Sequence, residues 1–249
     1  MRFTIKELDL RINIISDISI LEKAKFDKLQ ILYLFGNKIN DINNLNFQDL
    51  KELYLSKNNI IHLKALEKFK LDKLEVLNFV NNKISNIDIL EKVNFRELKN
   101  LNLRTNNISD INVLEKVKFD KLEILYLGEN KIIDIKILEK VSFKNLKYLD
   151  LSSNNISDIN VLKSVKFDNL ELLNLANNKI YNIKILIRTN FNKLEYLDIS
   201  DNKISDIQIF EKSIFEKLKY LNIKNNEIQE NEFSQIINFL SSKIENFFY

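Results

Sequence analysis

The sequence predicts an α/β solenoid of about ten stacked repeats, with a parallel sheet on a concave face and short α or 3₁₀ segments on a convex face. Three observations support this prediction. The pattern Leu-x-x-Leu-x-Leu-x-x-Asn-x-Ile recurs along the chain, the spacing of apolar residues changes within each copy, and Gly and Pro are nearly absent.

The repeat is marked by one Asn in each copy. Eight of the nine spacings between these Asn are 24 residues, and the exception, from Asn37 to Asn58, is 21. The register recovers at once after the short copy, so the three missing residues should lie on the surface. The ten positions are Asn13, Asn37, Asn58, Asn82, Asn106, Asn130, Asn154, Asn178, Asn202 and Asn226.

Each copy combines a strand with a helical turn. In a representative unit, Leu101 and Leu103 alternate as a strand requires, whereas Ile108, Ile111 and Leu114 follow at spacings of three, which predicts an α or 3₁₀ segment. Asp110 is placed to cap that segment. Asp or Asn recurs at the equivalent positions, which are Asp17, Asp41, Asn86, Asp134, Asp158, Asn182 and Asp206.

The turns need a device other than Gly and Pro. The chain has two Gly and no Pro, where average usage is about 7% and 5%. The side-chain amide of Asn both donates and accepts hydrogen bonds, so each recurring Asn is predicted to bond groups in its own turn and the next. The ten Asn are therefore interpreted as a structural ladder.

The pattern resembles the leucine-rich-repeat superfamily, over residues 5 to about 230. The resemblance implies a right-handed solenoid shaped as a curved horseshoe. The Ile-x-x-Ile-x-x-Leu half is similar to the class of the phosphatase regulator SDS22 and the bacterial internalins, although the 24-residue unit is atypical and adds a Phe. This Phe, expected to stack as an aromatic spine, is Phe26, Phe47, Phe95, Phe119, Phe143, Phe167, Phe191 or Phe215, with Leu71 in the remaining copy.

The domain organisation follows from where the repeats stop. Residues 1–230 are predicted to form the ten-repeat solenoid. Residues 231–249 break the pattern, and Ile236, Ile237 and Leu240 share one helical face. These last residues are therefore predicted to form a C-terminal capping helix.

The candidate binding surface consists of the strand residues that point away from the core. Six of the eight Tyr lie among twenty such positions, and Tyr offers a large contact area with a polar tip. An apolar stretch is expected at one end, and tyrosines with acids suited to a basic segment at the other. Strand propensity alone is the alternative explanation. The predicted partner-binding residues are Ile31, Tyr33, Phe35, Tyr54, Val76, Tyr126, Tyr148, Asp150, Tyr196, Asp198, Asp201 and Tyr220.

Catalytic chemistry has little support in the sequence. There is no Cys, the single residue His62 occupies a capping position, and no Gly-rich phosphate loop is present, so no enzyme, cofactor, metal site or small-molecule substrate is expected. The 38 basic and 35 acidic residues are interspersed, which argues against nucleic-acid binding.

The apolar runs are too short to span a membrane, and the first residues lack the features of a signal peptide. The expected location is therefore cytoplasmic, or secreted or at the cell surface if a leader has been removed. The function hypothesis is a non-catalytic scaffold or regulator that binds another protein, of unknown identity, on its Tyr-rich concave face. The alternative is a fragment of a bacterial internalin-like adhesin that binds a host protein.

Overall fold

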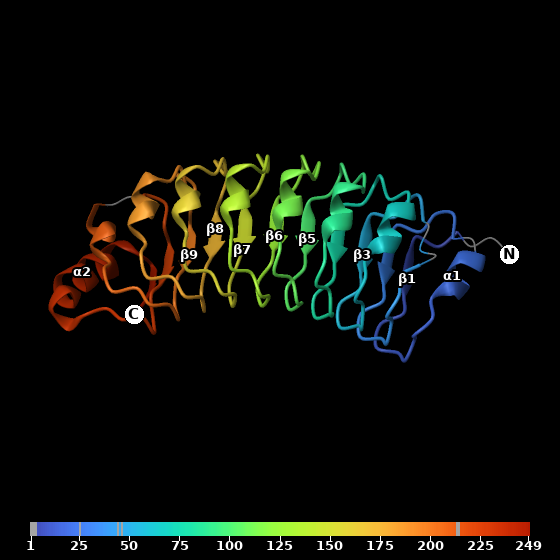
Figure 1. Ribbon diagram of the computed structural model, residues 1–249, viewed down its shortest axis with the longest axis horizontal. Coiled ribbons are helices and arrows are strands. Elements are labelled where there is room, and N and C mark those ends of the chain that lie inside the picture. The colour runs from blue at the N-terminus through green and yellow to red at the C-terminus, as the bar shows by residue number, and fades with distance from the viewer. Residues whose placement is uncertain (1–3, 25, 44, 46, 213–214) are drawn as a thin grey trace.

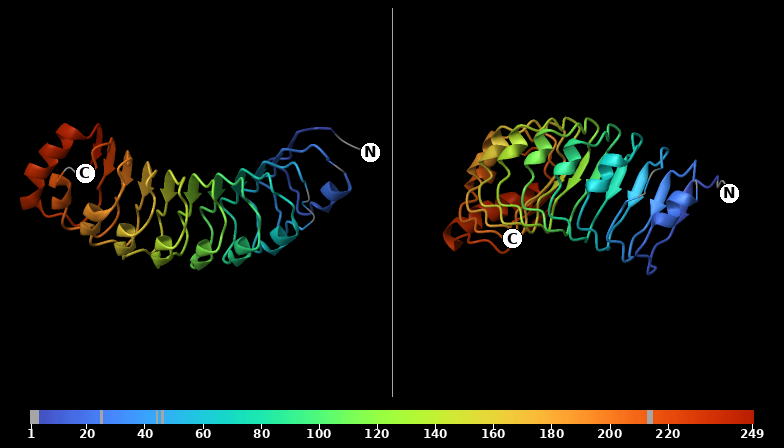
Figure 2. Two further views of the ribbon diagram at one scale, coloured as in Figure 1. Left: turned by 90° about the horizontal axis from the view of Figure 1, so that it is seen from above. Right: turned by 45° about the vertical axis from the view of Figure 1, so that its right-hand side comes forward.

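The computed structural model describes residues 4–24, 26–43, 45, 47–212 and 215–249. Its strands form one eleven-stranded parallel sheet, ordered as in the sequence. The strands line the inner side of an arc, and the short helices lie on its outer side (Figure 1, Figure 2). The strands are β1 (Glu7–Asp9), β2 (Ile31–Tyr33), β3 (Glu52–Tyr54), β4 (Val76–Asn78), β5 (Asn100–Asn102), β6 (Ile124–Tyr126), β7 (Tyr148–Asp150), β8 (Leu172–Asn174), β9 (Tyr196–Asp198), β10 (Tyr220–Asn222) and β11 (Asn246–Phe248).

The outer segments are mostly 3₁₀ helices of four or five residues. Apolar residues that repeat every three positions match the three residues per turn of a 3₁₀ helix. The helices are α1 (Ser19–Lys23), η1 (Lys64–Lys68), η2 (Asp88–Glu91), η3 (Asn112–Glu115), η4 (Lys136–Glu139), η5 (Asn160–Lys163), η6 (Lys184–Arg188), η7 (Gln208–Lys212) and α2 (Glu230–Lys243).

The core lies between the sheet and the outer segments. In each internal strand the central Leu is fully buried, and in the representative unit Leu101, Leu103, Ile108 and Ile111 are 0 to 2% exposed. Strand register places each Leu beside the Leu of the next repeat. The predicted fold is therefore confirmed, including the inward and outward sorting of alternate strand residues.

The turn after each strand uses the left-handed backbone conformation. The residue before each ladder Asn has a φ between 50° and 69° in all ten repeats, and only one of these residues is Gly. Asn tolerates this conformation better than most side chains, which explains in part why the chain contains so few Gly. The ten residues are Ile12, Gly36, Lys57, Asn81, Thr105, Glu129, Ser153, Asn177, Asp201 and Asn225.

The ladder Asn tie each repeat to the preceding one. Asn130 Nδ2 donates to the Leu127 and Gly128 carbonyls of its own turn, at 3.0 and 3.1 Å. It also donates to the Leu103 carbonyl at 3.0 Å, and its Oδ1 accepts the Ile108 N–H at 2.9 Å. Both of these partners belong to the preceding repeat. The prediction that the amide reaches the next repeat was wrong, because the side chain points back along the solenoid.

Carboxyl and amide side chains stabilise the start of the outer segments. Asp110 Oδ1 accepts the N–H of Asn112, the first residue of η3, at 2.8 Å, and seven equivalent bonds occur at the other predicted positions.

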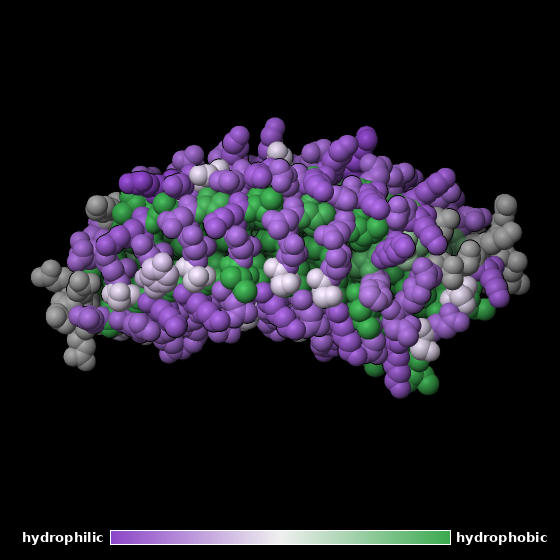
Figure 3. All heavy atoms as spheres, viewed as in Figure 1, coloured by the Kyte–Doolittle hydropathy of each residue, from purple (hydrophilic) through white to green (hydrophobic). Residues whose placement is uncertain are grey.

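The added Phe are buried or half-buried. Neighbouring rings contact at Phe26–Phe47 and Phe95–Phe119, with centroids 6.3 and 6.4 Å apart. The face bearing these segments is largely hydrophilic (Figure 3).

The C-terminal segment was predicted to be one helix over residues 231–249, but it is a helix followed by a strand. Helix α2 ends at Lys243, and Asn246–Phe248 form strand β11, which pairs in parallel with β10. The Ile223 N–H donates to the Phe248 carbonyl at 2.8 Å, and the Asn246 N–H to the Lys219 carbonyl at 2.9 Å. Both α2 and β11 therefore cover the last repeat.

Candidate protein-binding surface

Two columns of outward side chains run across the concave face. Strand register aligns the residue on either side of each central Leu with its counterpart in the next repeat, as in Tyr33 beside Tyr54 and Tyr196 beside Tyr220. We call the six half-buried tyrosines in these columns the concave tyrosine face. They are Tyr33, Tyr54, Tyr126, Tyr148, Tyr196 and Tyr220.

The N-terminal part of this face is an aromatic group with cations lying on its rings. Tyr33 and Tyr54 stack with centroids 5.0 Å apart. The Arg11 guanidinium lies 4.8 Å from the Tyr33 centroid, and the Lys57 ammonium lies 5.2 Å from that of Phe35. Such cation–π contacts attract a cation to the face of an aromatic ring.

The apolar residues predicted beside this group lie where the sequence places them. Ile31 and Val76 flank Glu52 in the first outward column, and both are half-buried. The Tyr54 hydroxyl donates to Glu52 Oε2 at 2.8 Å. This end of the surface therefore alternates aliphatic, aromatic and charged groups.

The C-terminal part is a second aromatic group. Tyr196 and Tyr220 stack face to face, with centroids 4.0 Å apart and planes at 8°. Tyr220 also contacts Phe248 of β11 at 5.2 Å. The sequence did not predict Phe248 here, because a strand after the terminal helix has no repeat signal.

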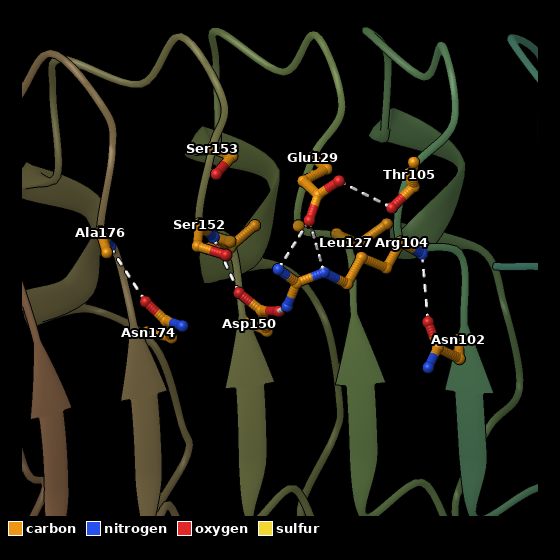
Figure 4. A network of polar contacts seen from close by, with 12 residues as sticks. Asn102, Arg104, Thr105, Leu127, Glu129, Asp150, Ser152, Ser153, Asn174 and Ala176 are labelled. Carbon is orange, nitrogen blue, oxygen red and sulfur yellow. Dashed lines mark hydrogen bonds and ion pairs between the residues drawn. The ribbon is translucent and has the colours of Figure 1, made fainter. Parts of the chain in front are cut away.

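Between the two groups an ionic network crosses three strands (Figure 4). Arg104 Nη1 lies 2.9 Å from Asp150 Oδ2, and Arg104 Nη2 lies 2.7 Å from Glu129 Oε1. The Thr105 hydroxyl donates to the other Glu129 oxygen at 2.9 Å. Arg104 reaches Asp150 across Gly128, which follows β6, and a Cβ at Gly128 would lie 2.8 Å from Asp150 Oδ2.

Sequence reasoning missed Arg104 and Gly128. Arg104 and Asp150 are 46 residues apart and lie in different columns, so a comparison of equivalent repeat positions does not pair them. One of only two Gly in the chain lies between them. Gly128 has no positive φ, so its role is to let the Asp150 carboxylate approach the backbone closely.

Two of the predicted acidic residues are more buried than expected. Asp150 is 4% exposed and Asp198 is 8% exposed, so the expectation of freely exposed carboxylates at these positions was wrong. Neighbouring side chains cover them: Arg104 over Asp150, and hydrogen-bond donors of Ser200 around Asp198. Asp201 is exposed, as predicted, and accepts a hydrogen bond from Asn225 Nδ2 at 2.8 Å.

Four of the tyrosine phenols, those of Tyr54, Tyr126, Tyr148 and Tyr196, remain protonated at neutral pH. Burial raises the pKa of Tyr54 and Tyr196 well above the ordinary value of 10.0, and burial also raises the pKa of Tyr126. The Glu171 carboxylate raises the pKa of Tyr148. The concave tyrosine face therefore presents O–H donors as well as ring surface.

Comparison with known proteins shows similarity to leucine-rich-repeat proteins. The model described as leucine-rich repeats (2 copies) matches residues 120–164 and 168–212. A search of curated proteins finds no match. An internalin, InlF, from Listeria monocytogenes is 29% identical with a TM-score of 0.75, over 98% of this chain and 73% of that chain.

Two further solved structures have the same fold. InlJ from Listeria monocytogenes is 24% identical with a TM-score of 0.70, over 96% of this chain and 47% of that chain. A chain of the octameric complex of latrophilin 3, Unc5D and the leucine-rich-repeat protein FLRT2 is 21% identical with a TM-score of 0.66, over 98% of this chain and 82% of that chain.

A repeated strand, turn and 3₁₀ unit with a ladder of Asn defines a leucine-rich-repeat solenoid. The chain has the leucine-rich-repeat fold and is similar to leucine-rich-repeat proteins, and membership of the SDS22-like class stays a prediction. Among the described residues, no helix has the length and apolar character needed to cross a membrane.

Proposed function

We propose that the chain is a non-catalytic scaffold or regulator that binds a partner protein on its concave face. The observation that carries this proposal is the concave tyrosine face, in which six half-buried tyrosines share one surface and four of them form two stacked pairs. Large amphipathic rings with little rotamer entropy to lose are typical of protein interfaces. Similarity to other leucine-rich-repeat structures supports a generic binding role.

The proposed partner is a protein and neither a nucleic acid nor a small-molecule substrate. Basic and acidic side chains pair across neighbouring repeats, as in Lys147–Glu123 at 2.8 Å and Lys219–Glu195 at 2.8 Å. Such pairing leaves little uncompensated positive charge for a phosphate backbone.

Substitution of the tyrosines tests the proposal. Tyr54, Tyr126, Tyr148 and Tyr196 are changed together to Ser, and captured proteins are compared by mass spectrometry with those of the unchanged chain. The matched control is Tyr181→Ser, because Tyr181 is 64% exposed and lies outside the concave columns. We expect the fourfold variant to lose partners that the control retains. Retention of every partner by a folded fourfold variant would show that the concave face is not the binding surface.

A second candidate is a fragment of an internalin-like adhesin that binds a host protein. The similarity to internalin InlF, at 29% identity over 98% of this chain, favours it. The location of the protein separates the candidates: an intracellular regulator stays in the cytosolic fraction, whereas an adhesin is recovered from the medium or the cell surface. A protease added to intact cells would degrade only the adhesin.

A further inference from the structure

Asp198, at the end of β9, has no cationic partner among the residues that the structure describes. Its carboxylate accepts neutral donors: the Ser200 N–H at 3.0 Å, the Ser200 hydroxyl at 2.6 Å and Asn222 Nδ2 at 3.2 Å. None of the ion pairs among the described residues includes Asp198. A carboxylate that is only 8% exposed is normally paired with a cation.

The equivalent aspartate two repeats earlier does hold a cation. Asp150 lies in the same column, 48 residues before Asp198, and pairs with Arg104 at 2.9 Å. The Arg104 side chain remains 39% exposed, although that of Asp150 is 6% exposed. A guanidinium lying on the concave surface therefore reaches a carboxylate in this column (Figure 4).

The chain supplies no such arginine to Asp198. Two repeats after Arg104 the residue is Ser152, and two repeats after Gly128 it is Ala176. A Cβ at Gly128 would lie 2.8 Å from Asp150 Oδ2, so the Cβ of Ala176 disfavours the same carboxylate position at Asp198.

The Asp198 carboxylate instead contacts the Tyr196 hydroxyl, next to the stacked rings of Tyr196 and Tyr220. Its Oδ2 lies 3.5 Å from the Tyr196 hydroxyl and 3.2 Å from Asn222 Nδ2. Tyr196 stacks on Tyr220 with centroids 4.0 Å apart. A planar cation that approached over these rings would gain cation–π contact and a charge-assisted hydrogen bond together, which favours arginine over lysine.

The charge pattern around Asp198 is also unbalanced. The residues just before successive strands alternate in sign, as Lys51, Glu75, Lys99, Glu123, Lys147 and Glu171. The alternation breaks at β9, where Glu195 follows Glu171. Lys219 pairs with Glu195 at 2.8 Å, and no ion pair among the described residues includes Glu171. The row of residues before the strands therefore has two successive acids at β8 and β9.

We propose that Asp198 and the stacked rings of Tyr196 and Tyr220 bind an arginine side chain in a basic segment of the partner protein. This inference rests on the proposed function and specifies the chemistry of the partner. The arginine supplies Asp198 with the charge that Arg104 supplies to Asp150, and the tyrosine rings give the second contact that Glu129 gives to Arg104.

A peptide titration tests this inference. A capped tetra-arginine peptide and its citrulline analogue, which has nearly the same shape without the charge, are titrated by calorimetry into the unchanged chain, Asp198→Asn and Glu139→Gln. Asn already occupies the Asp198 column as Asn78, Asn102, Asn174 and Asn222, so the fold accepts Asp198→Asn. Glu139→Gln removes the same charge from the exposed end of η4 on the convex face.

We expect the arginine peptide to bind the unchanged chain and Glu139→Gln alike, and to bind Asp198→Asn about tenfold more weakly because one charge-assisted hydrogen bond is lost. We expect the citrulline peptide not to bind. Equal affinity for Asp198→Asn, equal binding of citrulline or absence of binding would overturn the inference. If partner capture still depends on the four substituted tyrosines, only the arginine site has failed; if it does not, the proposed function has failed as well.

Discussion

At the scale of single residues, the left-handed turn positions determine which side chains are strained. Ile12 has a φ of 54° and is 76% exposed. A β-branched residue is poorly tolerated in this conformation, whereas Asn occupies it at Asn81, Asn177 and Asn225. The positive φ is therefore required by the backbone of the turn, and no contact of the Ile12 side chain requires it.

Ile12→Asn is expected to raise the free energy of unfolding by about 0.5–1 kcal/mol because it relieves left-handed strain. Denaturant unfolding measures the change. Ile14→Asn is the control, since Ile14 is 80% exposed and has no positive φ. If both substitutions change stability equally, removal of exposed apolar surface, rather than relief of strain, explains the effect.

Gly128→Ala is expected to lower the free energy of unfolding by about 1–3 kcal/mol. The new Cβ would lie 2.8 Å from Asp150 Oδ2, so the carboxylate must move away from Arg104. In an Asp150→Ala background the same substitution should cost less, because both carboxylate oxygens are gone and only Ser152 Oγ, at 2.9 Å, remains close to the new Cβ. Unfolding curves of the unchanged chain, the two single variants and the double variant give the coupling free energy between positions 128 and 150. An equal cost of Gly128→Ala in both backgrounds would contradict this explanation.

At the scale of elements, the connection between repeats is made by a single buried amide. Asn130→Ala is expected to cost about 2–4 kcal/mol, since three donated bonds and one accepted bond are lost and the freed backbone groups stay buried. Asn107→Ala, in the neighbouring turn, should change stability little because Asn107 is half-buried and only its backbone N–H is bonded, to the Ile84 carbonyl. Equal losses in thermal unfolding would refute the ladder as the main connection.

The start of η7 provides a pH-dependent contribution. The Gln208 backbone N–H, followed by Lys184, lowers the pKa of Asp206 below its ordinary value of 3.8. A lowered pKa in the folded state means that the carboxylate contributes stability above about pH 4 and loses it as the pH falls through the folded value.

Asp206→Asn keeps an acceptor, as Asn182 does in the preceding repeat, but cannot titrate. Its stability is therefore expected to fall less steeply than that of the unchanged chain between pH 4 and pH 2. Denaturant midpoints across this range measure the difference. Parallel acid curves for the two chains would contradict the assignment.

At the scale of the whole molecule, the last strand protects a sheet edge. Strand β11 pairs with β10 through hydrogen bonds at both of its ends. A chain truncated after Lys243 is expected to expose the β10 edge and to associate, because unpaired strand edges recruit other strands. Light scattering after size exclusion measures the mass, and a monodisperse monomer would show that α2 alone closes the solenoid.

The sequence predicts the fold well because every repeat contacts its neighbours in the same register. Leu32, Leu125 and Leu221 are equivalent in the pattern and equally buried. It predicts the surface less completely. Arg104 contacts Asp150 across 46 residues, and β11 pairs without any repeat motif, so neither contact leaves a signal in the periodicity. The partner-binding role of the concave residues stays a prediction.

The 21-residue copy has a consequence for length. Its strand β3 pairs with β2 and β4 in full register, although three residues are missing between Asn37 and Asn58. The length of an outer loop can thus change without changing the spacing between neighbouring strands, which is roughly 4.8 Å. Duplication of one unit between β4 and β7 would move the two aromatic groups apart by one such step. Gain or loss of whole units would therefore change the length of the concave face in steps of one strand spacing, and so the length of the partner that it fits.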